Sequence, residues 1–197
     1  MARILAVTGG IGSGKSYAVN VFSAMGVPVY DADSHTKALY DTNSDLLNKL
    51  VSLMGNNLVK DGRLDRSWMA SKVFNDRKLL DRVEETVYPY VISDIRDWAQ
   101  VNGAGTNGLV IIESAVFLEK PAFAGLADKV ATVSCPLEMR VERVMKRSGL
   151  SRKEVLDRMA NQWDDAKREA MADFVIVSDG CHPLLPQVYG IYMKMNG

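Results

Sequence analysis

Gly9-Gly10-Ile11-Gly12-Ser13-Gly14-Lys15-Ser16, near the start of a 197-residue chain, fits the phosphate-loop pattern G-x-x-x-x-G-K-[ST]. A short β-prone apolar run, Arg3 to Thr8, precedes it, and a helix-forming run begins at Tyr17. Glycines let backbone N–H groups turn toward phosphate oxygens, and the positive end of the following helix favours an anion. The alternative is a glycine-rich turn that matches by chance, but the flanking strand and helix favour a nucleoside triphosphate site.

The loop and the first turn of the helix supply the predicted nucleotide contacts. These residues are Gly10, Ile11, Gly12, Ser13, Gly14, Lys15, Ser16 and Tyr17. We expect Lys15 to reach the β- and γ-phosphates and the Ser16 hydroxyl to ligate Mg²⁺. The sequence therefore predicts a nucleotide with a divalent metal as its partner.

The composition is that of an ordinary globular protein, with 47% apolar and 24% charged residues. The 24 basic and 24 acidic residues cancel, so no overall field favours nucleic acid or an anionic membrane. Cys135 and Cys181 are far apart and form no metal-binding pair, which suits a reducing compartment. Met1-Ala2-Arg3 leads directly into the first apolar run and no run has the length of a membrane span, so we expect a cytoplasmic protein.

Further apolar runs predict an α/β fold with an open parallel sheet. These runs are 26–30, 109–112, 129–134 and 172–177, and helical stretches separate them. Ligands of such sheets bind beyond the carboxyl ends of the strands. We expect Asp31, Glu113 and the phosphate loop to lie there.

Two helical regions accompany this sheet. Residues 67–74, 77–87 and 91–101 carry apolar residues at helical spacing, with Pro89 interrupting the last two, so 34–103 is expected to be a mostly helical insertion. Residues 137–171 form a second, highly charged helical stretch that breaks at Ser148-Gly149-Leu150-Ser151. Ser151 and Glu154 form a predicted capping box after that break.

Four carboxylates could take part in phosphoryl transfer. Asp31 and Asp33 follow the second strand, and alternation along an extended chain would send both to the same side, where one could orient and deprotonate an acceptor hydroxyl. An aspartate that caps the next helix is the alternative. Glu113 ends an apolar strand, where it is either a metal ligand or a carboxylate satisfied by helix N–H groups; the sequence leaves both readings open. Glu119 is a weaker candidate.

The charged helical stretch carries six arginines, at positions 140, 143, 147, 152, 158 and 168. Most of them are expected on a solvated, ion-paired face. Arg143 and Arg147 are four residues apart and share one helix face just before a glycine-containing break. This arrangement suits a mobile lid that brings arginines to the triphosphate.

In order along nearly the whole chain, these motifs resemble those of the dephospho-coenzyme A kinase family. Similar segments are 8–16, Asp31-Ala32-Asp33, 62–66 with 73–74, 143–151, Arg158 with Gln162, and 172–176. The resemblance implies a P-loop three-layer α/β/α fold with a nucleotide-binding core (1–33, 104–138 and 171–197), a helical substrate domain (34–103) and a lid (139–170). It also implies transfer of the ATP γ-phosphate to the ribose 3′-hydroxyl of dephospho-coenzyme A. Asp33 then matches the base, and Arg143 and Arg147 match the lid arginines.

The chain departs from the family pattern at several positions. Tyr17 stands where threonine is usual, Tyr88-Pro89 replaces His-Pro, and Ala115 stands where proline is usual. Arg140 occupies a position that glutamine commonly fills. Another nucleoside or nucleoside monophosphate kinase is the alternative function. A GTP-dependent switch is disfavoured, because neither Asn/Thr-Lys-x-Asp nor a strand followed by Asp-x-x-Gly occurs.

Overall fold

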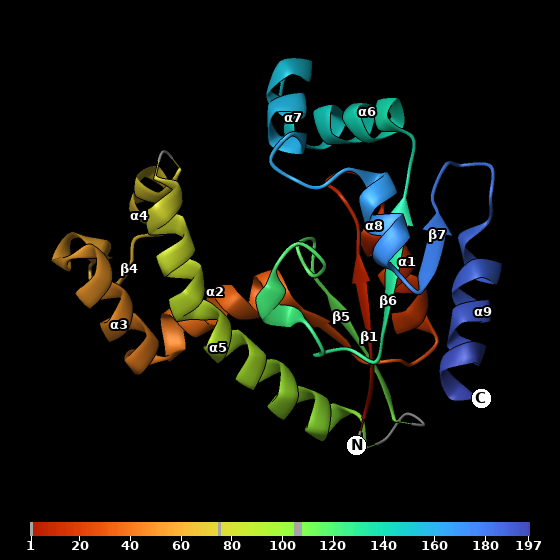
Figure 1. Ribbon diagram of the computed structural model, residues 1–197, viewed down its shortest axis with the longest axis horizontal. Coiled ribbons are helices and arrows are strands. Elements are labelled where there is room, and N and C mark those ends of the chain that lie inside the picture. Colours follow the sequence, from red (N-terminus) through yellow and green to blue (C-terminus); the bar gives the residue numbers. More distant parts are fainter. Residues whose placement is uncertain (1, 75, 105–107) are drawn as a thin grey trace. The chain divides into compact units, whose positions relative to one another are not determined.

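The structure is a computed structural model that describes residues 2–74, 76–104 and 108–197 (Figure 1). Residues 105–107, which fall in the predicted core segment 104–138, lie outside the described residues. The chain forms two compact units, residues 1–31 with 98–197, and residues 32–97, which are described separately below.

A five-stranded parallel sheet organises the first unit. Its strands are β1 (Arg3–Thr8), β2 (Val29–Asp31), β5 (Leu109–Glu113), β6 (Lys129–Ser134) and β7 (Phe174–Val177), in the order β2-β5-β1-β6-β7. The central strands are apolar on both faces because helices cover both sides, as expected for a parallel sheet. The predicted α/β fold with a parallel sheet is confirmed, although β2 and β7 begin later than the apolar runs suggested.

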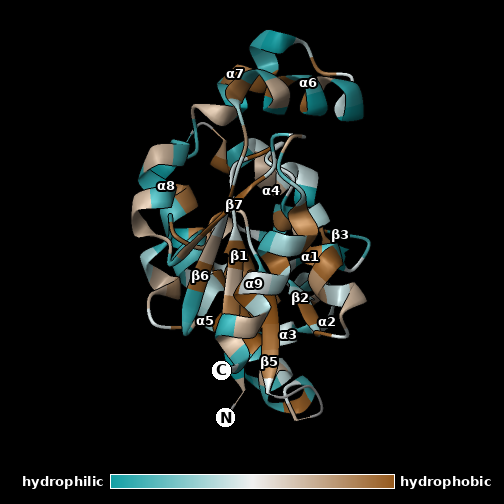
Figure 2. Cartoon of the chain, turned by 90° about the vertical axis from the view of Figure 1, so that its right-hand side faces the viewer, coloured by the Kyte–Doolittle hydropathy of each residue, from teal (hydrophilic) through white to brown (hydrophobic). Residues whose placement is uncertain are grey.

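Helices α1 (Lys15–Ala24) and α9 (Leu184–Asn196) pack on one face of this sheet, around Phe22, Leu5 and Ile191. On the other face Tyr30 of β2 meets Trp98 of α5 edge to face, with ring centroids 5.4 Å apart. Strand β5 is correspondingly brown in the hydropathy view (Figure 2). Together these layers hold the carboxyl ends of β1, β2 and β5 in fixed register.

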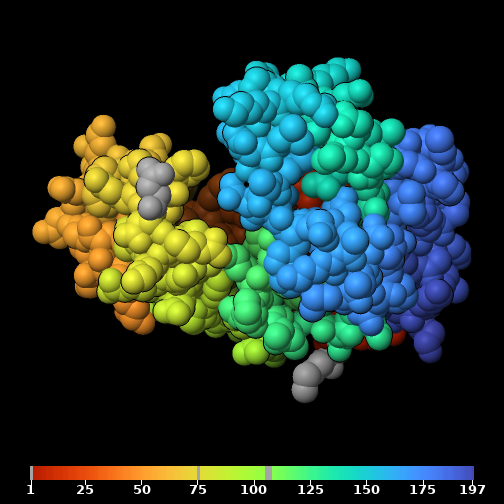
Figure 3. Space-filling model, turned by 45° about the horizontal axis from the view of Figure 1, so that its top comes forward, coloured from red at the N-terminus to blue at the C-terminus, as the bar shows by residue number. Residues whose placement is uncertain are grey.

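Three helices follow β6: α6 (Leu137–Ser148), α7 (Arg152–Met159) and α8 (Asp165–Met171). Val141, Val144 and Val155 form a small core between α6 and α7, and Ile11 of the phosphate loop packs against it. The predicted break and capping box are confirmed: Gly149 ends α6 with φ 68°, and Ser151 and Glu154 cap α7 reciprocally. In the space-filling view α6 and α7 (cyan) and α8 (blue) form one group, beside which part of the red N-terminal segment is visible (Figure 3).

The second unit is mostly helical, as predicted. It contains α2 (Ala32–Thr42), α3 (Ser44–Met54), the 3₁₀ turn Asn56–Leu58, α4 (Arg66–Val73) and the greater part of α5 (Arg77–Asn102). Its only strands within the described residues are the two-residue pair β3 (Val59–Lys60) and β4 (Arg63–Leu64), joined by a tight turn. A second 3₁₀ turn, Pro121–Phe123, belongs to the first unit.

The prediction that Pro89 separates two helices was wrong, because α5 continues through it. Buried residues recur every four positions on both sides of the proline, at Val83, Val87, Val91, Ile95 and Ala99. This unbroken apolar stripe outweighs the loss of one intrahelical hydrogen bond. Pro89 itself is exposed, so water can satisfy the carbonyl that loses its donor. No helix of the described residues is long and apolar enough to cross a membrane.

Candidate active site

The phosphate loop connects the end of β1 at Thr8 to the start of α1 at Lys15, so strand, loop and helix follow one another as predicted. Gly14 precedes the helix with φ 98°, in the left-handed region. A Cβ at Gly14 would lie 2.7 Å from the Ser178 hydroxyl oxygen, so both the backbone conformation and the space require glycine. The loop is therefore a tight cradle beneath the positive end of α1, which suits phosphate oxygens.

Ser16 and Glu113 lie together at the carboxyl edge of the sheet. The Ser16 hydroxyl donates a hydrogen bond to Glu113 Oε1 over 3.2 Å. Glu113 is paired in register with Val7 of β1 and with Asp31 of β2, so the sheet brings Asp31 next to it. Oxygen ligands of this kind suit Mg²⁺, which commonly uses one or two protein groups and completes its shell with phosphate and water.

The described residues contain no cluster of three or more His, Cys, Asp and Glu side chains that could hold a metal ion alone. The Ser16–Glu113 pair therefore fits a metal that arrives with a nucleotide better than a resident metal. This fit rests on the oxygen chemistry of the pair and on the phosphate cradle beside it.

The reasoning that placed Asp31 and Asp33 on one side was wrong. Strand β2 ends at Asp31 and α2 begins at Ala32, so the alternation of an extended chain stops between the two aspartates. Asp33 is instead an exposed residue in the first turn of α2, in the second unit, while Asp31 belongs to the first. A carboxylate there also stabilises the positive end of the helix.

Arg143 anchors α6 to the loop and to the end of β7. Its guanidinium donates to the Ser178 carbonyl over 3.1 Å, to the Ser178 hydroxyl over 3.2 Å and to the Ser13 carbonyl over 3.3 Å. It also contacts Cys135 Sγ at 3.2 Å. Burial raises the pKa of the Cys135 thiol, an effect that Arg143 and Arg140 partly oppose. Arg147, one turn further along α6, is exposed.

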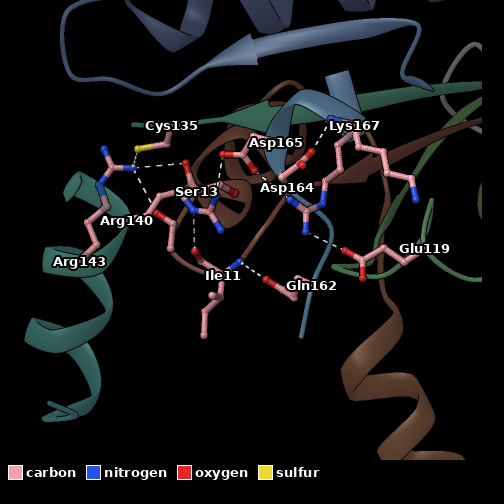
Figure 4. A network of polar contacts seen from close by, with 12 residues as sticks. Ile11, Ser13, Glu119, Cys135, Arg140, Arg143, Gln162, Asp164, Asp165 and Lys167 are labelled. Atoms are coloured by element: carbon pink, nitrogen blue, oxygen red, sulfur yellow. Dashed lines mark hydrogen bonds and ion pairs between the residues drawn. The ribbon is translucent and has the colours of Figure 1, made fainter. Parts of the chain in front are cut away.

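Two arginines that we expected on a solvated face are buried. Arg140 and Arg168 have side chains only 7% and 0% exposed, and both pair with Asp165 (Figure 4). Arg147, Arg152 and Arg158 do lie on the exposed side. The burial of Arg140 could have been predicted from the sequence, because Arg140 lies four residues before Val144 and so on the same helix face, and Val144 is also buried. Arg168 gives no comparable sign in the sequence.

Ile11 has partners for both of its backbone polar groups. Its N–H donates to Gln162 Oε1 over 2.8 Å, and its carbonyl accepts from Arg140 Nε over 3.0 Å (Figure 4). A phosphate contact through the Ile11 amide would therefore require the Gln162 bond to break. All the predicted nucleotide contacts remain predictions: Gly10, Ile11, Gly12, Ser13, Gly14, Lys15, Ser16 and Tyr17.

The parallel sheet, the phosphate loop and the acidic residue on the neighbouring strand define a P-loop nucleotide-binding protein of the α/β/α type. A sequence model of the dephospho-CoA kinase family matches residues 3–183. Dephospho-CoA kinase from Bacteroides fragilis is 33% identical over 188 residues, covering 95% of this chain and 90% of the relative. That of Porphyromonas gingivalis is 35% identical over 188 residues, covering 95% of this chain and 91% of the relative.

Solved structures of kinases have a similar fold. A dephospho-CoA kinase from Campylobacter jejuni superposes with a TM-score of 0.72 at 25% identity, covering 100% of this chain and 98% of the other. A shikimate kinase from Acinetobacter baumannii reaches a TM-score of 0.54 at 11% identity, covering 99% and 93%, and so shares the fold. The chain belongs to the dephospho-CoA kinase family, whose members are ATP-dependent kinases.

Proposed function

We propose that this protein transfers the γ-phosphate of ATP to the ribose 3′-hydroxyl of dephospho-coenzyme A, the last step of coenzyme A synthesis. The observation that carries the proposal is the Ser16–Glu113 pair beside the phosphate loop, in a chain that belongs to this family. In-line phosphoryl transfer needs little covalent chemistry from the protein, so positioning and charge stabilisation supply the rate.

Lys15 and the loop amides are proposed to bind the β- and γ-phosphates. Ser16 and Glu113 would hold Mg²⁺, which when bound neutralises charge on the phosphate oxygens. Support comes from the left-handed glycine at position 14 and from the start of α1 at Lys15, which places the positive end of the helix directly after the loop.

Asp33 is proposed to orient the acceptor hydroxyl and accept its proton. It is exposed and therefore accessible to a substrate, and it matches the family position of the base. Arg143 and Arg147 are proposed to stabilise the transferring phosphoryl group from a lid formed by residues 139–170. Residues 34–103 are proposed to be the helical substrate domain. Arg143 would act from its position against the loop carbonyls, and Arg147 from its exposed position one turn later.

We propose dephospho-coenzyme A as the partner, with no role for nucleic acid or membrane, and a cytoplasmic location. The equal numbers of acidic and basic residues support this proposal, because they leave no excess charge to attract either polyanion. A nucleoside or nucleoside monophosphate kinase remains the alternative, since the phosphate loop and the sheet would be the same.

The test is ADP release from Mg-ATP with dephospho-coenzyme A, compared with adenosine and AMP as acceptors, with the product identified by mass. Selective turnover to coenzyme A supports the proposal. Turnover with only adenosine or AMP would leave the nucleotide site in place and contradict the assigned acceptor.

A further inference from the structure

A line of alternating charges crosses the interior of the first unit. Arg140 Nη1 of α6 donates to Asp165 Oδ2 over 2.6 Å, and Arg168 Nη1 of α8 donates to Asp165 Oδ1 over 2.9 Å. The second terminal nitrogen of Arg168 donates to Glu119 Oε1 over 2.7 Å. Two positive and two negative side chains thus balance one another, which reduces the cost of burying them.

One end of this line touches the phosphate loop directly. Arg140 Nε donates to the carbonyl of Ile11 over 3.0 Å, so a single guanidinium connects the loop to Asp165 (Figure 4). The guanidinium also lies close to Gly10, where an added Cβ would be 2.2 Å from Arg140 Nη2 and 2.8 Å from Cζ. Arginine suits this place because its planar group offers several donors in a fixed arrangement.

The same loop residue is held from a second direction. Gln162, in the connection between α7 and α8, accepts the Ile11 N–H, and the Ile11 side chain packs against the small core of α6 and α7. The peptide groups on both sides of Ile11 are therefore fixed by residues outside the loop. The orientation of the following amides of the loop depends on these two peptides.

We propose that Arg140 is a positioning residue for nucleotide binding, which fixes the phosphate loop by donating a hydrogen bond to the Ile11 carbonyl while Asp165 holds its guanidinium. The inference rests on the proposed function, because it requires that the loop bind a nucleotide. It assigns Arg140 no contact with the nucleotide itself. Its effect is carried by the peptide group that joins Ile11 and Gly12.

Two substitutions separate the hydrogen bond from the charge. Arg140→Met keeps an unbranched apolar stem but removes every donor, while Arg140→Gln restores one N–H donor and still lacks the charge. In both variants Asp165 keeps its bond to Arg168, so no buried carboxylate is left unpaired. Arg152→Met is the matched control, because Arg152 pairs with Glu138 at the exposed surface of the same helical group.

The measurement is the dissociation constant of ADP in the presence of Mg²⁺, by calorimetry, well below the melting temperature of each variant. We expect Arg140→Met to weaken ADP binding about tenfold, and Arg140→Gln to recover most of that loss. The KM for the acceptor should stay unchanged, and Arg152→Met should bind ADP like the wild type. Asp165→Asn keeps the shape of the side chain and an oxygen acceptor but removes the charge, and it should weaken ADP binding about threefold by loosening the Arg140 guanidinium.

A merely structural role predicts a different pattern. Arg140→Met and Arg140→Gln would then lower the melting temperature equally, and the apparent kcat would fall because a smaller fraction of the protein is folded. The ADP dissociation constant would be unchanged. Unchanged ADP dissociation constants, or equal weakening of ADP binding in both variants, would overturn the inference. The proposed function would stand in either case, provided that the wild-type protein binds ADP. A wild-type protein that binds no ADP would overturn the proposed function, and this inference with it.

Discussion

The hydroxyl of Ser16, the second residue of α1, donates a hydrogen bond to the carboxylate of Glu113, the last residue of β5. The two residues are 97 positions apart in the chain, and the parallel pairing of β5 with β1 brings them together. A loop next to one strand and an acidic residue at the end of its neighbour thus form one edge of the sheet. This is where ligands of open parallel sheets bind.

Replacing either member of this pair should raise the Mg²⁺ requirement. We expect Glu113→Gln and Ser16→Ala each to increase the Mg²⁺ concentration for half-maximal rate by about 10- to 100-fold, because the first removes the charge of one oxygen ligand and the second removes the other oxygen. Initial rates across a Mg²⁺ titration measure this shift. Ser23→Ala, an exposed serine on the same helix, is the control. A Glu113→Gln enzyme with an unchanged Mg²⁺ profile would show that Glu113 is no metal ligand.

Asp33→Asn should lower turnover and leave nucleotide binding intact. Loss of a general base costs about 10²- to 10⁴-fold in rate, while an amide of the same shape disturbs the helix little. Single-turnover rates and ADP binding measured on the same preparation separate the two effects. Asp31→Asn is the informative comparison, since Asp31 lies beside Glu113 and is the other candidate. If Asp31→Asn abolishes turnover and Asp33→Asn does not, the roles are reversed.

Substitutions of Arg143 and of Arg147 should change the stability of the protein to different extents, although both residues are proposed to act on the phosphoryl group. Arg143→Gln breaks hydrogen bonds to Ser178 and to the loop, and should cost about 1–3 kcal/mol of unfolding free energy together with activity. Arg147→Gln changes an exposed side chain, so its unfolding free energy should stay within about 0.5 kcal/mol of the wild type.

The activity of Arg147→Gln should nevertheless fall, by at least about tenfold in kcat, because Arg147 is proposed to stabilise the negative charge that develops during transfer. Urea denaturation and steady-state kinetics of the two variants measure both quantities. Wild-type kinetics in Arg147→Gln would remove this residue from the mechanism.

Local sequence signals predicted much of this structure because they act over short distances. The phosphate loop, the apolar strand before it and the Ser151–Glu154 capping box each depend on neighbours within a few residues, and each took the predicted form. The end of β2 at Asp31 is also local, but the turn from strand to helix at Ala32 carries no glycine or proline to mark it. That is why the extended chain was expected to continue from Asp31 to Asp33.

Long-range contacts explain what the sequence did not show. Arg140 and Arg168 occur on charged helices that resemble solvated ones, and their burial is compensated by carboxylates distant in the sequence or in the next element, Asp165 for both and Glu119 for Arg168. Similarly, Pro89 is a helix breaker in isolation, but the apolar stripe on α5 keeps the helix continuous once it packs. In both cases tertiary packing reverses the local preference.

The turn after β7 should make stability fall in acid. Asp179 accepts hydrogen bonds from the backbone N–H of His182, from the His182 ring and from the N–H of Cys181, and these hold its pKa well below the usual aspartate range. Because the pKa of Asp179 is lower in the folded than in the unfolded state, the carboxylate stabilises the protein at pH values above its unfolded-state pKa near 4. This contribution is lost as the pH falls further.

Asp179→Asn keeps acceptors for the two backbone N–H groups but removes the charge. We therefore expect the variant to melt at a lower temperature than the wild type at pH 6, with the difference shrinking toward pH 3. Melting temperatures at constant ionic strength measure this, and a difference that stays constant across that range would show that the charge of Asp179 contributes nothing.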